Sequence, residues 1–372
     1  MKVICAKDEL IKGMQIVSPV IASKITLPVL SNFLFETEDN KIKLSATDLE
    51  IGVTCYIKAE IVQEGAITIP AKRFNDIVKE VSDGNIEIKA DETNQINLKA
   101  GKSKFVLMGM DKKDYPTLPD FKKDNIFSVK SSVLNAMFKK TIFSVSKDSQ
   151  KYVLNGVYFI IENGVLKAVS TDGRRLSYVN IEGFDKEIKG KVIIPTKAVS
   201  DILRLIASND KIEEVKISLS DNLMTVMIGD ITFQTKLIEG VFPNYEQVIP
   251  KKTMSKIKLN SAQTMTAVKQ MALLTGDKLV ADRSSSIRFS FEKNKMIVSA
   301  NTVGLGSGET EVEIEYTGEV FDINFNPNYI KDILQNIEDE NIYFSYTTPQ
   351  SPVIITPEKD KNYLCVVMPM RQ

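Results

Sequence analysis

Apolar and polar positions follow a pattern that recurs three times along the chain. Each copy reads as an apolar-rich strand, a polar turn around Asn or Asp, an alternating second strand, a small polar turn and a third strand. The copies are residues 32–57, 156–181 and 286–314. The turn pair Thr47-Asp48 of the first copy recurs as Thr171-Asp172 in the second, 124 positions later (171 − 47). This regular offset indicates an internal repeat.

Two helices accompany each copy in the same order. One is expected before the strands, where apolar residues stand at helical spacing. These segments are 6–17, 130–143 and 260–274. The other is expected after a short strand that runs into Pro or Asn. These segments are 66–81, 191–206 and 321–337. Paired strands then close each copy.

The repeat predicts the fold class and the domain organisation. We expect an α+β fold of three repeated domains with helices and antiparallel sheets, each domain of roughly 125 residues. Proline-marked, partly charged segments at 111–125 and 240–254 are the expected linkers. The predicted domains are residues 1–125, 126–250 and 251–372.

The composition is that of an ordinary globular protein. Of the 372 residues, 43% are hydrophobic and 26% are charged, and 48 Lys and Arg balance 48 Asp and Glu. A formal charge of zero argues against a nucleic-acid binder with a strongly basic overall field, although charge can still be sorted between faces. Histidine, the commonest general base and metal ligand, is absent, which lowers the expectation of an enzyme.

The cysteines and the hydropathy pattern predict the compartment. Cys5, Cys55 and Cys365 are widely spaced, form no C-x-x-C motif and are odd in number, so a reducing compartment is expected. The N-terminus lacks the long apolar core of a signal peptide, and no window reaches the roughly 18 apolar residues of a membrane span. We expect a cytoplasmic protein that binds no membrane.

Motifs that would support catalysis are weak. The stretch GLGSGE at 304–309 follows a strand, as a phosphate loop would. No G-K-[ST] follows it and the next segment alternates like a strand, so a hairpin turn is favoured. No paired carboxylates, metal-ligand cluster or nucleophile elbow stands out. We therefore predict no catalytic residue, no metal and no cofactor.

The stretch STDGRRLS at 170–177 has two interpretations. Asp172-Gly173 is a strong hairpin-turn signal, and the twin stretch in the first copy lacks the arginines. Arg174 and Arg175 are therefore additions to a scaffold turn. Such additions suggest a surface contact, either with a ligand or with solvent alone.

Basic residues lie on the predicted helices, while several acidic clusters lie in strands and loops. The sorting is partial, and solvated helix faces would explain it. Basic helices on a neutral protein would also suit loose contact with phosphates.

The last ten residues, YLCVVMPMRQ, are unusually apolar for a chain end. Residues 363–367 match the closing strand of the other copies, so a structural strand is one interpretation. It does not explain the methionines and proline that follow, which leaves open a surface made for another molecule.

Seven stretches together resemble the bacterial DNA polymerase III beta sliding clamp over the whole chain. They are TLPVLSNFLF (26–35), LSATDLEIGV (44–53), IPAKRFNDI (69–77), YVLNGVYF (152–159), VSTDGRRLSYV (169–179), KLIEGVFPNYEQVIP (236–250) and YLCVVMPMR (363–371). The resemblance implies a non-catalytic homodimeric ring of six domains, with helices lining the hole and sheets outside. Such a ring encircles duplex DNA without sequence preference. It tethers the replicative polymerase, and it binds the clamp loader and repair proteins through short linear motifs.

The resemblance also implies a hydrophobic pocket for those motifs between the second and third domains, formed in part by the terminal segment. Methionine suits this task because it is flexible and polarizable. Carried over by position, the pocket would consist of Val153, Leu154, Thr171, Gly173, Arg174, Arg175, Leu176, Pro243, Gln247, Val248, Asn326, Tyr329, Val366, Val367, Met368, Pro369, Met370 and Arg371.

Two further surfaces follow from the resemblance. DNA contacts would involve Lys24, Lys72, Lys151, Tyr152, Arg174 and Lys197. The interface between subunits would place Arg73, Ile77, Lys102, Lys104, Phe105 and Leu107 against Leu273 and Leu274 of the other subunit. An apolar centre with a charged rim is an ordinary interface design.

The chain departs from many relatives at three places. They have arginine where Gln247 stands and histidine where Arg174 stands, which implies a pocket with an altered charge distribution. Some also carry an acidic cluster where this chain has residues 301–309. We therefore predict a ring interface that depends mainly on apolar contacts and opens more easily.

Two other functions are weighed against this one. The first is a three-lobed protein-binding scaffold that does not encircle DNA, which would need neither the apolar Leu273-Leu274 pair nor the basic helices. The second is an enzyme that uses GLGSGE or TDGRR, which the missing histidine and the repeat disfavour.

Overall fold

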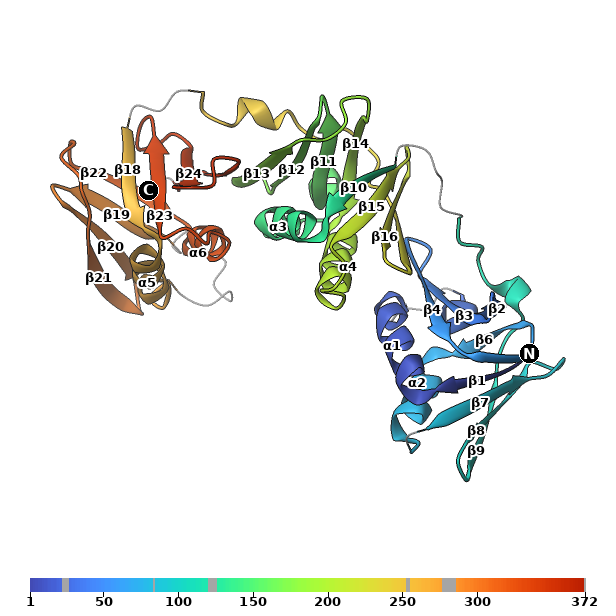
Figure 1. Cartoon of the computed structure of the whole chain (residues 1–372). Coiled ribbons are helices and arrows are strands. Elements are labelled where there is room, and N and C mark those ends of the chain that lie inside the picture. The colour runs from blue at the N-terminus through green and yellow to red at the C-terminus, as the bar shows by residue number, and fades with distance from the viewer. Residues whose placement is uncertain (22–26, 83, 120–125, 252–254, 276–285, 371–372) are drawn as a thin grey trace. The chain divides into compact units, whose positions relative to one another are not determined.

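A computed structural model describes residues 1–21, 27–82, 84–119, 126–251, 255–275 and 286–370. The chain forms two compact units, each with helices and antiparallel sheets (Figure 1). The first unit consists of residues 1–134 and 197–237, and the second of residues 135–196 and 238–372.

The elements follow one another in the same order three times. Each repeat has a strand, a helix, several strands, a second helix and three closing strands. The first repeat consists of β1 (Lys2–Ala6), α1 (Lys7–Val17), β2 (Asn32–Glu38), β3 (Lys41–Thr47), β4 (Ile51–Lys58), β5 (Glu60–Gln63), β6 (Ala66–Pro70), α2 (Ala71–Glu80), β7 (Asn85–Ala90), β8 (Gln95–Ala100) and β9 (Ser103–Met108).

The second and third repeats have the same design. The second consists of β10 (Ile126–Lys130), α3 (Ser131–Ile142), β11 (Gly156–Glu162), β12 (Val165–Thr171), β13 (Arg175–Glu182), β14 (Gly190–Pro195), α4 (Thr196–Ala207), β15 (Glu214–Leu219), β16 (Leu223–Ile228) and β17 (Ile231–Lys236). The third consists of β18 (Ser255–Asn260), α5 (Ser261–Ala272), β19 (Ile287–Glu292), β20 (Lys295–Thr302), β21 (Gly306–Glu313), β22 (Phe321–Phe325), α6 (Pro327–Gln335), β23 (Asn341–Tyr346), β24 (Val353–Pro357) and β25 (Tyr363–Val367).

The predicted helices and the α+β class are confirmed, and the predicted hairpin turn at GLGSGE joins β20 to β21. The predicted strand at 363–367 is confirmed as β25, while sequence analysis missed the opening strands β1, β10 and β18. Each is only five or six residues long, and periodicity cannot separate so short an apolar run from the helix beside it.

Local chemistry sets where the second helices begin. Pro327 occupies the first position of α6, where its missing N–H costs no hydrogen bond. The side-chain oxygen of Asn326 accepts from the backbone N–H of Asn328 at 2.9 Å and so caps the helix. The two helices of a repeat pack together, α1 with α2 and α5 with α6 (Figure 1).

Each unit contains one long sheet that crosses from one repeat into the next. In the first unit the strand order is β10-β15-β16-β17-β4-β3-β2-β6, and Phe233 of β17 pairs with Val53 of β4. In the second unit the order is β14-β11-β12-β13-β25-β24-β23-β18, and Cys365 of β25 pairs with Ser177 of β13. The closing strand of one repeat therefore extends a sheet of the repeat before it. We call these contacts the first and second repeat junctions.

Each unit also contains one shorter sheet. Their orders are β5-β1-β7-β8-β9 in the first unit and β21-β20-β19-β22 in the second. Strands β9 and β21 both lie at a sheet edge, where backbone groups are open to another strand.

Aromatic side chains fill much of the core. In the first repeat, Phe35 of β2 and Phe74 of α2 meet edge to face, with ring centroids 5.4 Å apart. Phe289 and Phe325 of the third repeat make the same contact at 5.4 Å.

None of the described helices combines the length and the apolar content that a membrane span requires.

Candidate binding surface at the second repeat junction

The pairing of β13 with β25 brings the turn at 171–175 beside the end of the chain. Leu176 lies opposite Val366, and Arg175 lies opposite Val367. Beyond the strand, the backbone N–H of Met368 donates to the Arg174 carbonyl at 2.8 Å, and that of Met370 donates to the Asn324 carbonyl at 2.8 Å. The terminal segment is therefore held by backbone hydrogen bonds to the second and third repeats.

The turn itself is built by its own side chains. The Asp172 Oδ1 atom accepts from the backbone N–H groups of Arg174 and Arg175, at 2.8 and 3.0 Å. The Thr171 hydroxyl donates to the Arg175 carbonyl at 2.6 Å and accepts from the Gly173 N–H at 3.0 Å. Gly173 has a φ of +88°, which favours glycine. The predicted hairpin turn is confirmed.

Arg175 is buried, so the predicted contact with solvent alone is wrong for this residue, and its contact with a ligand stays a prediction. Its side chain is 8% exposed. The Nε atom lies 3.2 Å from Asp172 Oδ2, Nη1 lies 2.7 Å from Asp332 Oδ2 of α6, and Nη2 donates to the Phe143 carbonyl at 2.5 Å. Two carboxylates and a carbonyl thus compensate the buried charge. Arg174, its neighbour, is exposed.

Tyr329 of α6 completes this arrangement. The guanidinium carbon of Arg175 lies 4.6 Å from the centroid of its ring, within the range of a cation–π contact. Burial raises the pKa of the Tyr329 hydroxyl. A cavity of about 620 Å³ opens next to Arg175 and Asp332, lined also by Phe143, Ser146 and Asn155. Arg175 therefore connects the β13 turn to helix α6.

A hydrophobic cluster lies on the other face of the sheet. It brings together three predicted pocket residues, Leu154, Leu176 and Val366, with Val153 packed against them. Val367, another predicted pocket residue, is buried on the opposite face because neighbouring residues of a strand point to opposite sides.

Two aromatic residues that sequence analysis missed cover this cluster. Phe242 stacks on Tyr158 with ring centroids 4.7 Å apart, and Tyr245 lies 5.9 Å from Tyr178. Both come from the segment after β17, between Leu237 and Pro250. The sequence did contain a signal for them, namely aromatic residues in an otherwise polar linker. Large aromatic rings are usually buried against other apolar groups.

Exposed apolar side chains border the buried cluster. Val248 is 45% exposed and Met368 is 37% exposed. Pro243 and Gln247 are also exposed, while Pro369 and Met370 are half-buried. Arg371 lies outside the described residues. The buried cluster and the exposed side chains of Val248 and Met368 beside it together form an apolar surface. Such a surface is suited to an apolar side chain of another molecule.

The residues predicted to contact DNA lie in both units. Lys72 of α2 is exposed, and Lys197 of α4 lies 2.5 Å from Asp48. Lys151 donates to the Asp172 carbonyl at 3.0 Å, and Tyr152 beside it is exposed. Lys24 lies outside the described residues.

The residues predicted for the subunit interface lie mostly on edge elements. Lys104 of β9 and Lys102 in the turn before it are exposed, and Phe105 of β9 is half-buried. On α2, Arg73 is exposed and Ile77 is half-buried. Leu273 is 83% exposed, and Leu274 packs beside Gly308 of β21.

Leu107 differs from its predicted role. It lies opposite Ile96 of β8 and is buried with it in the core of the first repeat. Val106 and Met108, which sequence analysis did not select, are the exposed apolar side chains of β9. Alternation along the strand explains the difference, since residues 105 and 107 share the core face.

The three cysteines are buried, and we expect them to be unreactive in the folded protein. Burial raises the pKa of Cys5 and Cys55 to about 12 and that of Cys365 to about 11, so the nucleophilic thiolate is scarce at neutral pH. Ellman's reagent at pH 8 should label none of them quickly, and all three after unfolding in guanidinium. Rapid labelling of one thiol in the folded protein would contradict the burial.

The same pKa shifts predict a pH dependence. Each thiol holds its proton in the folded protein at a pH where the unfolded chain has lost it. The free energy of unfolding should therefore fall as pH rises from about 9 to about 11, by up to roughly 1.4 kcal/mol per pH unit for each thiol. Denaturation curves across this range would measure it, with a Cys365→Ser variant as control.

Comparison with known proteins covers the whole chain. Sequence profiles of the DNA polymerase III beta subunit match residues 1–119 with its N-terminal domain, 128–244 with its central domain and 246–371 with its C-terminal domain. The beta sliding clamp of Chlamydia pneumoniae is 34% identical over 372 residues, which are 100% of this chain and 99% of the relative. That of Pseudomonas aeruginosa is 31% identical over 368 residues, 98% of each chain.

Solved structures agree with these sequences. The crystal structure of a DnaN sliding clamp from Pseudomonas aeruginosa bound to griselimycin has a TM-score of 0.93 at 30% identity, over 100% of both chains. A DnaN sliding clamp from Bartonella birtlesii bound to griselimycin has a TM-score of 0.92 at 30% identity, again over 100% of both chains.

Within the described residues, no group of three or more Cys, Asp or Glu side chains is arranged to hold a metal ion.

Proposed function

This chain belongs to the DNA polymerase III beta subunit family, and from that premise we propose that it is a sliding clamp. It is a non-catalytic processivity factor, a homodimeric ring that encircles duplex DNA in the cytoplasm and tethers the replicative polymerase. The clamp loader and repair proteins bind the same ring through short linear motifs.

Three domains per subunit, residues 1–125, 126–250 and 251–372, support the ring. The order of elements repeats with these segments, and each repeat junction joins two repeats by a continuous antiparallel sheet. Backbone pairing across a junction makes a stiff connection between neighbouring domains. A ring of two such subunits needs one further interface, used twice, to close.

Contact with DNA in such a ring need not be strong. The balance of 48 basic and 48 acidic residues suits a ring held by topology rather than by affinity. Exposed Lys72 and Tyr152, with Lys151, Arg174 and Lys197, are the proposed contacts. Lysine and arginine bind phosphates without reading the sequence, which allows sliding.

The observation that best supports partner binding is the second repeat junction. There the terminal segment is fixed by the hydrogen bonds of Met368 and Met370, and the exposed side chains of Met368 and Val248 border a buried apolar floor. Two structural relatives are bound to griselimycin. We take this surface as the pocket for the linear motifs.

The proposed subunit interface joins the edge strands β9 and β21. Both have unpaired backbone groups along one side, and Leu273 next to β21 and Val106 and Met108 of β9 are exposed apolar side chains. Because the acidic cluster of some relatives is replaced here by the turn of β20 and β21, the contact is mainly apolar.

The apolar interface predicts a weak dependence of dimer dissociation on salt. We expect the dissociation constant to change by less than about threefold between 50 mM and 500 mM NaCl, since salt screens charges and leaves apolar burial in place. Analytical ultracentrifugation over this range measures it, and Met108→Asp should produce monomers. A steep rise of the constant with salt would contradict an apolar interface.

The ring itself is tested by retention on DNA. The clamp is loaded with a compatible loader and ATP onto nicked circular plasmid, half of the sample is linearised, and both halves are gel-filtered. Retention on circles with loss from linear DNA shows topological linkage and supports the proposal. A second clamp known to load serves as control.

Two outcomes would contradict the ring. Equal retention on both forms would indicate ordinary DNA binding. No association with either form, while the control clamp loads, would favour a protein-binding scaffold that does not encircle DNA.

A further inference from the structure

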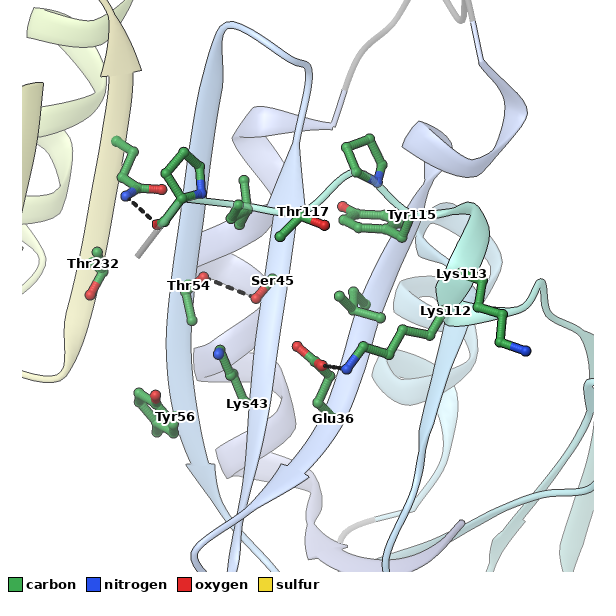
Figure 2. Close-up of a pocket in the computed structure, with 15 residues that line it drawn as sticks. Glu36, Lys43, Ser45, Thr54, Tyr56, Lys112, Lys113, Tyr115, Thr117 and Thr232 are labelled. Carbon is green, nitrogen blue, oxygen red and sulfur yellow. Dashed lines mark hydrogen bonds and ion pairs between the residues drawn. The ribbon is translucent and has the colours of Figure 1, made fainter. Parts of the chain in front are cut away.

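The first repeat junction contains a hollow of about 520 Å³ (Figure 2). Its floor is formed by side chains of β2, β3, β4 and β17, and its wall by residues 112–119, which follow β9. This volume lies in the range of sites that bind small molecules.

The two junctions can be compared position by position, because their strands pair in the same register. At the first junction one row crosses the sheet through Leu34, Ser45, Thr54 and Thr232. At the second junction the same register gives Tyr158, Val169, Tyr178 and Leu364. The first row is thus smaller and more polar than the second.

The segments that cover the two rows also differ, and the one at the second junction carries more aromatic rings. At both junctions an aromatic ring covers the start of the row, Tyr115 beside Leu34 and Phe242 on Tyr158. At the second junction the ring of Tyr245 then lies 6.3 Å from that of Tyr158 and 5.9 Å from that of Tyr178.

At the first junction Leu118 lies where the wall passes over β4, so close that a Cβ added at Gly52 would be 2.6 Å from its Cδ2 atom. Leucine at this point, with Ser45 and Thr54 below, leaves open the volume that tyrosine rings fill at the second junction. The hollow therefore has room for an aromatic ring at this point.

The lining indicates which ring would fit. Leu34, Tyr115 and Leu118 supply apolar walls, and the hydroxyls of Ser45 and Thr54 lie 2.9 Å apart on the floor. Figure 2 shows Lys43 and Lys112 beside this space and Lys113 at its outer edge, with the Lys113 side chain directed away from Glu36 and Ser45. Lys112 is 2.5 Å from Glu36, and Lys43 is 3.3 Å from Glu38. Lys113 has no ion-pair partner among the described residues and is exposed.

We propose that this hollow is a second docking site, for a segment of a partner protein that inserts an aromatic side chain flanked by carboxylates. The ring takes the place that Tyr245 occupies at the second junction, its polar tip meets the Ser45 and Thr54 hydroxyls, and the carboxylates meet Lys113 and Lys43 at the mouth. The site is separate from the pocket proposed above and does not depend on the encircling of DNA.

The test uses the full-length protein and the peptide acetyl-Glu-Tyr-Glu-amide as probe. Methyl signals of Leu34, Thr54 and Leu118 are followed by NMR while the peptide is added. We expect saturable shifts of these three signals and none at Val366 of the second junction. Acetyl-Glu-Ala-Glu-amide and acetyl-Lys-Tyr-Lys-amide should each bind at least about tenfold more weakly, because each lacks one of the two recognised groups.

Variants separate the proposed site from nonspecific binding. Thr54→Tyr inserts the residue that the second repeat carries at this position, so it should fold and weaken binding by at least about tenfold. Lys113→Gln should weaken binding by about threefold, as loss of one exposed ion pair does, while Lys99→Gln on β8 should not. Far-UV circular dichroism confirms that each variant folds.

Three results would overturn the proposal. They are the absence of saturable shifts at Leu34, Thr54 and Leu118 up to 10 mM peptide, equal binding of the alanine peptide, and undiminished binding by a folded Thr54→Tyr variant. Shifts confined to Val366 would likewise assign the peptide to the second junction alone.

Discussion

Replacing Arg175 by alanine is expected to lower the free energy of unfolding by about 3 kcal/mol, since removal of one partner from a buried ion pair costs roughly 3–5 kcal/mol. The variant leaves Asp172, Asp332 and the Phe143 carbonyl without the guanidinium that now binds all three. It also removes the cation–π contact with Tyr329. We expect the low end of the range because the Asp332 side chain is 32% exposed, and water can solvate it in the variant.

The neighbouring arginine provides a matched control. Arg174 is exposed, and Arg174→Ala should change the free energy of unfolding by less than about 0.5 kcal/mol, as surface substitutions usually do. Guanidinium denaturation followed by circular dichroism measures both variants. Asp332→Asn should also be less destabilising than Arg175→Ala, since Arg175 keeps Asp172. Equal effects of Arg174→Ala and Arg175→Ala would contradict the buried network.

The repeated part of the fold could be predicted from the sequence, because periodicity and turn residues are local signals. The turns at Asp172-Gly173 and at 304–309 and the strand at 363–367 are examples. The junctions could not be predicted from these signals. Cys365 pairs with Ser177 across 188 positions, and the alternation of a strand does not identify its partner.

The candidate site could likewise be predicted only in part. The resemblance to known clamps supplied its residues, but not their environment. Arg175 sits next to exposed Arg174, and one of the groups that compensate its buried charge, Asp332, is contributed by the following repeat. The opposite orientations of Val366 and Val367 follow from strand alternation, which sequence analysis could have applied. Phe242 and Tyr245 required the three-dimensional arrangement of the linker.

On the proposed function, griselimycin serves as a probe of the pocket, and a chain that ends at Val367 is expected to bind it at least about 30-fold more weakly than the full chain. It lacks the exposed side chain of Met368 and the half-buried Pro369 and Met370, and loss of central apolar contacts at a binding site typically costs 2 kcal/mol or more. Isothermal titration calorimetry measures the affinity. Met368→Ala should account for part of the loss.

The fold should largely survive this truncation, which separates binding from stability. Among the described residues, the truncation removes the backbone hydrogen bonds of Met368 and Met370, each worth about 1 kcal/mol, while β25 keeps its pairing with β13 and β24. Val241→Ala is the matched control, because Val241 is an exposed apolar residue outside the cluster. If the truncated chain and the control bind griselimycin equally well, the terminal segment is not part of the pocket, and its backbone hydrogen bonds serve only to hold it to the second and third repeats.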